Sequence, residues 1–320
     1  MIRPRYPVQE LCLRHSFEEV AYLRWHGELP TQEQISAQNR AERAQRAGAW
    51  EIVAAIAQQP LPDHPLDTLR NAVTLLGVQD TASHDPAPAA IRAQALRLSA
   101  VVPAVIAMDQ RLRNGLGVIA PRDHLSHAAN FLNMTFGQVP EPQIVAAFEK
   151  SLILYTEHSG TAAPLATAGP DLYTTVTTAI DGLRDTPNAS AGEAVLAMIN
   201  EIAIPDNARP WLADAMAGAR NIAGFGHDVQ ADADSRVPAM RAALGMIAAL
   251  RGGENLLEIH DTIADAVYEA KGLRPSLDFP ASLAYKLIGF DTPTFAPIVI
   301  AASLPSWTAR FAHQLARQPG

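Results

Sequence analysis

The chain has 320 residues, of which 48% are hydrophobic and 18% charged, and its net charge is −8 at pH 7. This is the composition of an ordinary globular protein, and it lacks the basic stripe that nucleic-acid phosphates require, so nucleic-acid binding is excluded. Proline interrupts the longest apolar stretches before they reach the roughly 18 residues that cross a bilayer, and the N-terminus has no secretory signal, so the sequence predicts a cytoplasmic protein without a membrane segment.

Apolar residues recur with helical spacing along almost the whole chain. The first predicted helix covers residues 16–27, where Ser16 and Glu19 have the spacing of a capping box, and a second start of the same kind follows at Thr31. The remaining predicted helices cover residues 64–77, 89–115, 124–137, 142–158, 171–183, 192–202, 210–222, 236–253, 255–272, 280–290 and 294–317. No run of alternating residues predicts a strand, so the predicted fold class is all-α.

Prolines and glycines cluster between these segments, where helices are expected to end. Residues 184–192, "RDTPNASAG", are one candidate for a compact hinge between two lobes. The chain contains no C-x-x-C, no H-E-x-x-H and no EF-hand loop, so no dedicated metal site is predicted. Six histidines are expected on helix ends or polar faces, as solvated or locally hydrogen-bonded imidazoles: His26, His64, His84, His124, His260 and His313.

The stretch "GFGHDVQADADSR", residues 224–236, combines glycines, a histidine and an arginine. Gly224 and Gly226 allow the backbone to approach a ligand closely and present amide donors beside His227. The same pattern also fits a simple turn before a helix, with Arg236 paired to a nearby aspartate. Both readings stay open on these residues alone.

Asp278 in "LRPSLDFPAS" is the second candidate. Its neighbours Leu277 and Phe279 are apolar, and a carboxyl group in apolar surroundings can have a raised pKa and act as a base. An aspartate at this place can equally cap the helix that follows.

Four segments taken together, "FEEVAYLRWHGELPT", "LILYTEH", "GFGH…DSR" and "PSLDF", resemble the citrate synthase family in order and spacing, although this sequence is shorter at both ends. The resemblance implies a two-lobed helical homodimer, or a heterodimer with a paralogue. It also implies a large dimer-forming domain of residues 1–188 and 290–320 and a small domain of residues 189–289 with the CoA and catalytic loops.

The resemblance further implies an acyltransferase, as in the tricarboxylic acid cycle. The enol of an acyl-CoA, either acetyl-CoA or propionyl-CoA, attacks a 2-oxo acid to give citrate, 2-methylcitrate or a related product, without a tightly bound cofactor. Asp278 matches the base that removes the α-proton, and His227 matches the histidine that polarises the keto carbonyl. Arg236 and His158 match residues that bind the 2-oxo acid, and the loop residues Gly224, Phe225 and Gly226 match the CoA-binding backbone.

The sequence departs from the family pattern at several of its functional positions. Asn188 in "DTPNASAG" stands where the family has a catalytic histidine; its amide can donate to an enolate oxygen but cannot exchange a proton, and it can alternatively cap the next helix. Ser303 in "SLPSW" replaces a carboxylate-binding arginine, and Arg310 lies seven residues further on, where it can face the same side. Asp228 and Ala231 replace basic residues near the expected nucleotide. Lys271 and Arg274 can restore positive charge there, or they can be solvated cations at a helix end.

Two hypotheses therefore remain. The retained residues favour a citrate-synthase-like enzyme with an altered acceptor, whereas the changes at Asn188 and Ser303 favour a catalytically impaired paralogue that acts as a dimeric binding or regulatory subunit.

Overall fold

The computed structural model describes residues 6–157, 169–184, 191–225 and 234–316. Within these ranges the chain forms fourteen α-helices and no strand, and the only extended pairing is a single bridge between Phe225 and Pro275. The predicted all-α fold class is confirmed. The helices are α1 Val8–Arg14, α2 Phe17–His26, α3 Gln32–Ala57, α4 Pro65–Gln79, α5 Pro88–Arg113, α6 His127–Phe136, α7 Pro142–Tyr155, α8 Leu172–Arg184, α9 Ala191–Ile202, α10 Ala208–Ala217, α11 Val237–Arg251, α12 Glu254–Lys271, α13 Asp278–Ile288 and α14 Phe295–Leu315.

The two predicted capping boxes are present. Ser16 Oγ accepts from the Glu19 backbone N–H at 3.2 Å, and the Glu19 carboxylate accepts from the Ser16 N–H at 2.8 Å. Thr31 and Gln34 repeat this arrangement at the start of α3. These reciprocal bonds satisfy backbone donors that a helix start leaves unpaired, which explains why both starts could be read from the sequence.

Several details of the predicted elements were wrong. The helix α1 was not predicted, because it is only seven residues long and too short to show a clear periodicity. The helix expected to run to residue 222 ends at Ala217, because Gly218 follows as its C-cap. The helix expected from residue 280 begins two residues earlier, at Asp278.

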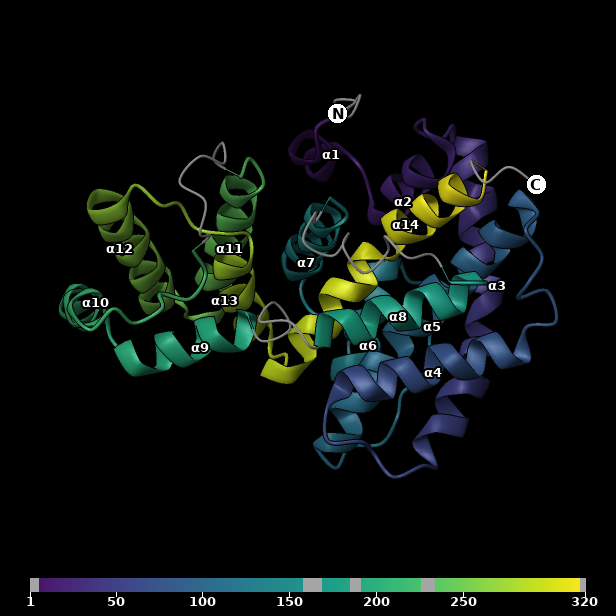
Figure 1. Ribbon diagram of the computed structural model, residues 1–320, viewed down its shortest axis with the longest axis horizontal. Helices are drawn as coiled ribbons and strands as arrows, with labels where there is room; N and C mark the ends of the chain where they lie inside the picture. Colours follow the sequence, from purple (N-terminus) through teal and green to yellow (C-terminus); the bar gives the residue numbers. More distant parts are fainter. Residues whose placement is uncertain (1–5, 158–168, 185–190, 226–233, 317–320) are drawn as a thin grey trace.

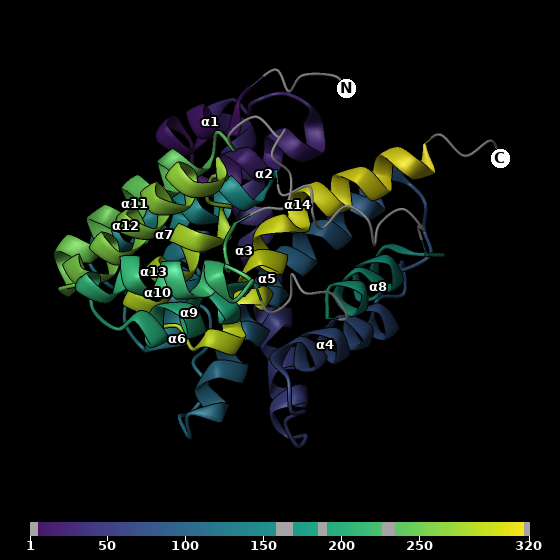
Figure 2. The ribbon, with the colours of Figure 1, turned by 60° about the vertical axis from the view of Figure 1, so that its left-hand side comes forward.

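Figure 1 shows α9 to α13 gathered on one side of the molecule and α2 to α6 with α8 on the other. The helix α7 lies between the two groups and packs against α11, while α14 returns the chain to the second group and packs along α5. In Figure 2 the helices α4 and α8 lie side by side, as their contacts also show. The predicted division into residues 1–188 with 290–320 and residues 189–289 stays a prediction.

The helix α5 is the central element of the second group. By length and composition it is the one helix in the described ranges that could cross a membrane, but 78% of its most apolar window is buried inside the protein. Pro103 lies within it. Burial on this scale is expected of a core helix, which needs the same apolar residues as a membrane span.

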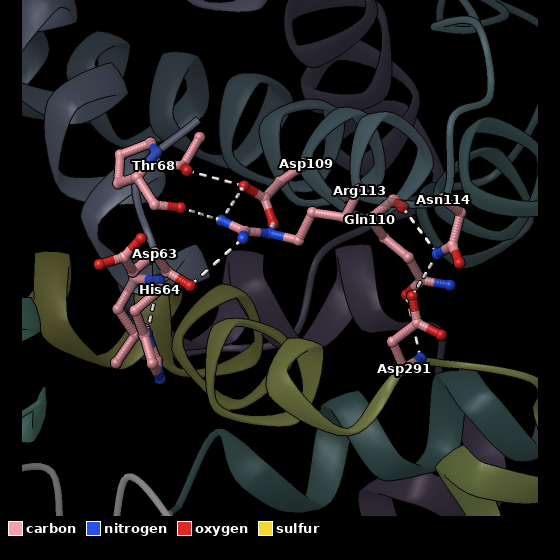
Figure 3. A network of polar contacts seen from close by, with 10 residues as sticks. Asp63, His64, Thr68, Asp109, Gln110, Arg113, Asn114 and Asp291 are labelled. Carbon is pink, nitrogen blue, oxygen red and sulfur yellow. Dashed lines mark hydrogen bonds and ion pairs between the residues drawn. The ribbon is translucent and has the colours of Figure 1, made fainter. Parts of the chain in front are cut away.

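A polar network fixes this core helix to its neighbours (Figure 3). The buried Asp109 of α5 accepts from Thr68 Oγ1 of α4 at 2.7 Å and from Arg113 Nε at 2.7 Å. One turn along, the Asn114 amide donates to Asp291, which directly precedes the turn Thr292–Thr294 and the start of α14. The network therefore sets where α14 begins relative to α5.

Candidate active site

Asp278 is the first residue of α13, so its carboxylate lies at the positive end of the helix dipole. Leu277 is the N-cap, and no side chain caps this helix. The alternative that Asp278 is only a helix cap is therefore wrong. Its Oδ1 instead accepts a hydrogen bond of 2.7 Å from the hydroxyl of Tyr155, which lies 123 residues earlier in the chain.

Tyr155 is the last residue of α7 and is only 1% exposed. Burial, together with the nearby charge of Asp278, raises the pKa of the Tyr155 hydroxyl well above its ordinary value, so this group stays a hydrogen-bond donor. Tyr155 lies within the family-like segment "LILYTEH", but the sequence predicted no role for it. No local pattern could have revealed it, because its function depends on a partner from a distant helix.

Arg236 reaches the same end of α7 from the start of α11. Its side chain is 13% exposed, and Nη1 donates to the Leu154 carbonyl at 3.4 Å. Asp234 occupies the other edge of the guanidinium, accepting from Nε at 2.8 Å and from Nη2 at 2.7 Å. Burial opposes the charge on Arg236, but the hydrogen bonds and charge of Asp234 outweigh it and raise the pKa of Arg236.

The predicted pairing of Arg236 with a nearby aspartate is therefore confirmed, and its role in binding the 2-oxo acid stays a prediction. Arg236 also lies one residue from Tyr155 along the end of α7. A carboxylate arriving from a ligand would compete with Asp234 for the same donors.

The glycine-rich segment packs directly against the start of α13. Gly224 has φ of +83°, and a Cβ at this position would lie 2.8 Å from Phe279 Cβ. The Gly224 carbonyl accepts from the Ser276 N–H at 2.8 Å, and the Phe225 ring lies 5.4 Å from the Phe279 ring. Gly224 is therefore required by its positive φ and by its close packing against α13, which brings the segment beside Asp278. The predicted approach of this backbone to a ligand stays a prediction.

Four of the predicted site residues, His158, Asn188, Gly226 and His227, lie outside the described residues. Two described residues near these gaps contact α13. Phe225 lies against Phe279, and a Cβ on Gly192, near the start of α9, would lie 3.0 Å from Ser282 Oγ. Ser282 in turn donates to the Asp278 carbonyl at 2.7 Å.

A cavity of about 370 Å³ opens beside Phe225. Ile222, Val267 and Leu273 give it apolar walls, and Lys271 contributes a positive charge at its edge. Arg274 is exposed, and its guanidinium lies 4.5 Å above the ring of Tyr268, outside the lining of this cavity. Of the two cations predicted near the nucleotide, Lys271 therefore lines this cavity and Arg274 does not.

Ser303 lies at the end of α7 as well, but it brings no charge. It is 2% exposed, and its hydroxyl donates to the Val299 carbonyl at 2.8 Å and to the Tyr155 carbonyl at 3.5 Å. Arg310, two turns further along the same helix, is exposed, whereas Ser303 is buried. The expectation that Arg310 supplies the missing cation stays a prediction.

His260 corrects a further expectation. It does not lie on a polar face but is 3% exposed, with its ring 4.6 Å from that of Phe279. The expected local hydrogen bond is present, from Nδ1 to Asp261 at 2.9 Å. Burial lowers the pKa of His260 despite the adjacent carboxylate. In the described ranges no group of three or more His, Cys, Asp and Glu side chains is placed to hold a metal ion.

In this all-helical fold, a helix-start aspartate, a buried tyrosine and a clamped arginine lie near one another beside a glycine-rich segment. In the comparison with protein families, residues 5–319 match the family described as citrate synthase, C-terminal domain. The chain belongs to the citrate synthase family.

Known relatives fall into two kinds of synthase. The chain is 42% identical over 314 residues to the 2-methylcitrate synthase of Mycobacterium tuberculosis, covering 97% of this chain and 79% of the relative. It is 40% identical to the citrate synthase of Mycolicibacterium smegmatis, covering 97% and 84% of the two chains.

Among solved structures, the citrate synthase of Thermoplasma acidophilum in a ternary complex with carboxymethyl coenzyme A and oxaloacetate has the same fold. Its TM-score is 0.88 at 24% identity, and the match covers 98% of this chain and 85% of that one. The relatives make this chain an acyltransferase by family, and nothing in the comparisons supports a regulatory subunit without activity.

Proposed function

We propose that the protein condenses an acyl-CoA with a 2-oxo acid to give citrate, 2-methylcitrate or a related product. The observation that carries this proposal is the contact between Tyr155 and Asp278 at the end of α7, with Arg236 on the same helix end. An oriented carboxylate beside a cation is what enol formation followed by attack on a charged acceptor requires. The two kinds of relative support acetyl-CoA or propionyl-CoA as the donor.

Asp278 would act as the base. Tyr155 donates to Oδ1 and so fixes the direction of the carboxylate, while Oδ2 takes the α-proton of the thioester. The α-carbon of the resulting enolate then attacks the keto carbon of the 2-oxo acid, and the keto oxygen becomes an alkoxide that takes up a proton. Water then hydrolyses the thioester, which releases CoA and the tricarboxylate. Because Tyr155 keeps its own proton, it stabilises the ionised form of the base without competing for the proton that Asp278 removes.

The residues outside the described ranges have proposed roles that come from the family motifs. His227 would donate to the keto oxygen as it gains charge, and Asn188 would donate its amide to the enolate oxygen. His158 would contact the 2-oxo acid together with Arg236. An oxyanion donor of this kind typically contributes about 2.7–4 kcal/mol.

The cavity beside Phe225 is our proposed site for part of the acyl-CoA. Its apolar walls suit a planar base, and Lys271 supplies a charge for a phosphate. Gly224 and Phe225 would form the backbone edge of this site, continuing through Gly226. Arg274 would have to leave the ring of Tyr268 to contribute, so we give it a minor part in phosphate binding.

We further propose a homodimer in the cytoplasm, as the family resemblance suggests, with a heterodimer of paralogues as the alternative assembly. Size measurement by light scattering on the purified protein distinguishes a dimer from a monomer, and co-expression with a paralogue tests the mixed form.

The experiment that tests the function is proton exchange. The protein is incubated with acetyl-CoA or propionyl-CoA in deuterated water, with and without oxaloacetate, and deuterium at the α-carbon is followed by mass spectrometry. We expect exchange in the native protein and its loss in Asp278→Asn. Asp181→Asn is the matched control, because it makes the same change at a half-buried residue of α8, paired to Arg70 at 3.5 Å. Absence of exchange and of product with every acyl-CoA tried would refute the proposal.

A further inference from the structure

A positively charged side chain from α2 reaches the C-terminal end of α7. Arg24 lies in the last turn of α2, and its Nη2 donates to Thr156 Oγ1 at 3.3 Å and to Glu157 Oε1 at 2.9 Å. Thr156 is the C-cap of α7, so the guanidinium lies where the helix end carries partial negative charge. Only 20% of the Arg24 side chain is exposed, so the cation is held within the protein and not on its surface.

The contacts of the Arg24 guanidinium leave one of its donors without an acceptor among the described residues. Both of its contacts are made by Nη2, whereas Nε is buried and has no acceptor in the part of the chain that the structure describes. A buried N–H without an acceptor is unfavourable, and arginine donors suit the oxygens of a carboxylate. An acceptor from a bound molecule would complete this group.

The segment that Arg24 contacts is also the segment on which the candidate active site is built. Within residues 154–157, the first carbonyl accepts from Arg236, the tyrosine donates to Asp278, and the tyrosine carbonyl accepts from Ser303. Arg24 contacts the last two residues of this segment. The cation is therefore joined to the site through two consecutive residues.

The helix α14, by contrast, offers only hydroxyl groups at this place. Ser303 is buried and neutral, and one turn further on Ser306 donates to the Thr156 carbonyl. Thr156 thus receives a hydroxyl from α14 on its carbonyl and the guanidinium of Arg24 on its side chain. Arg24 of α2 therefore brings to Thr156 the positive charge that α14 does not supply.

We propose that Arg24 binds a carboxylate of the 2-oxo acid and so selects a dianionic acceptor. This inference rests on the proposed function and adds a residue to its acceptor side. Glu157 orients Arg24 as Asp234 orients Arg236, and each pair leaves a guanidinium at the end of α7. Two such cations match an acceptor with two carboxylates, whereas a monocarboxylate needs only one of them.

The test compares Arg24→Met with the native protein. Methionine keeps an unbranched chain but removes every donor. At saturating acyl-CoA, we expect KM for oxaloacetate to rise by about 10-fold or more, the loss expected of one charge-assisted pair. KM for the monoanion pyruvate and KM for the acyl-CoA should change by less than about 2-fold, because neither loses a contact. Arg24→Lys, which keeps the charge without the planar fork, should give an intermediate KM for oxaloacetate.

Two controls separate binding from packing. Arg251→Met removes a similar ion pair at the other end of α7, where Nη2 meets Glu141 at 2.8 Å, and should leave all KM values unchanged. Glu157→Gln removes the orienting partner but keeps the cation, so it should raise KM for oxaloacetate less than Arg24→Met does. If Arg24→Met does not fold, the lysine variant carries the comparison.

The outcomes are distinct. An unchanged KM for oxaloacetate, or equal rises for oxaloacetate and pyruvate, in an otherwise active enzyme would overturn the role of Arg24 and leave the proposed function standing. A native protein that neither exchanges the α-proton nor binds oxaloacetate in titration calorimetry would overturn both.

Discussion

The two sides of the candidate active site differ in how much of the family pattern they keep. On the side of α13, Gly224 packs against Phe279 and Tyr155 holds Asp278, the proposed base, although Asn188 replaces the family's histidine. On the side of α14, Ser303 brings no cation, and the positive charge comes from α2 through Arg24. We infer that the residues for enol formation and the residues that bind the 2-oxo acid can change independently within one site.

Placing arginine at position 303 is the strongest test of this difference. If α14 had merely lost a cation, Ser303→Arg would restore it and lower KM for oxaloacetate. The structure predicts the opposite, because the site is 2% exposed and the Ser303 hydroxyl bonds to Val299. Burying an unpaired charge there should lower the free energy of unfolding by about 3–5 kcal/mol, measured by urea denaturation.

Ser303→Ala serves as the control and should cost about 1 kcal/mol, since only one neutral hydrogen-bonding group is lost. An arginine variant with native stability and tighter oxaloacetate binding would show that the α14 side still has room for its cation, and Arg24 would no longer be needed as its replacement.

Gly224→Ala tests the α13 side of the candidate active site. The new Cβ would meet Phe279 at 2.8 Å and Val195 at 3.1 Å, and alanine disfavours φ of +83°. We expect a loss of about 2–4 kcal/mol in the free energy of unfolding, with a higher KM for the acyl-CoA. Gly27→Ala is the matched control: it has φ of +80° but open space around it, so it isolates the backbone strain. Equal effects in the two variants would mean that the contact with Phe279 contributes nothing.

The fold could be predicted from the sequence because its signals are local. The capping boxes at Ser16 and Thr31 and the helical spacing of apolar residues act within a few residues, so they are visible in one sequence. The short helix α1 was missed because its packing against α7, and not its own periodicity, stabilises it. His260 was misplaced because its burial depends on Phe279 of another helix.

The site was predictable only where motifs carry it. Gly224, Arg236 and Asp278 were identified from the family resemblance, and the structure brings these three to the ends of α7 and α13. The resemblance could not identify Tyr155 or Arg24, because each acts through a partner more than 120 residues away. Contacts of this kind depend on the tertiary arrangement, so no local sequence pattern indicates them.

The pH dependence of stability tests how Glu149 holds α2, the helix of Arg24, against α7. The Glu149 carboxylate accepts from the Phe17 N–H at 3.2 Å and so ties the start of α2, the helix that carries Arg24, to α7. Burial and the charge of Glu18 raise the pKa of Glu149 to about 7. Between the ordinary value of 4.5 and about 7, the unfolded chain loses this proton while the folded protein keeps it. Stability from this group therefore falls as pH rises through this window.

Glu149→Gln removes that dependence but keeps an oxygen to accept from Phe17. We expect the variant to be more stable than the native protein at pH 8, by at most about 2–3 kcal/mol, and equally stable at pH 4. Thermal unfolding across this pH range measures the difference. A constant gap between the two proteins at every pH would mean that Glu149 does not titrate in the window.

Tyr155→Phe should have the smallest effect, and it separates the two sides most finely. Phenylalanine keeps the buried ring of α7 but removes the hydrogen bond to Asp278 Oδ1. The base then loses its orientation and one stabilising donor, so we expect kcat to fall about 10-fold, which corresponds to about 1.4 kcal/mol. KM for oxaloacetate should hold, because Arg24 and Arg236 are untouched. A variant that raises KM for oxaloacetate while leaving kcat unchanged would assign Tyr155 to the acceptor side instead, and the separation between enol formation and acceptor binding at the end of α7 would no longer hold.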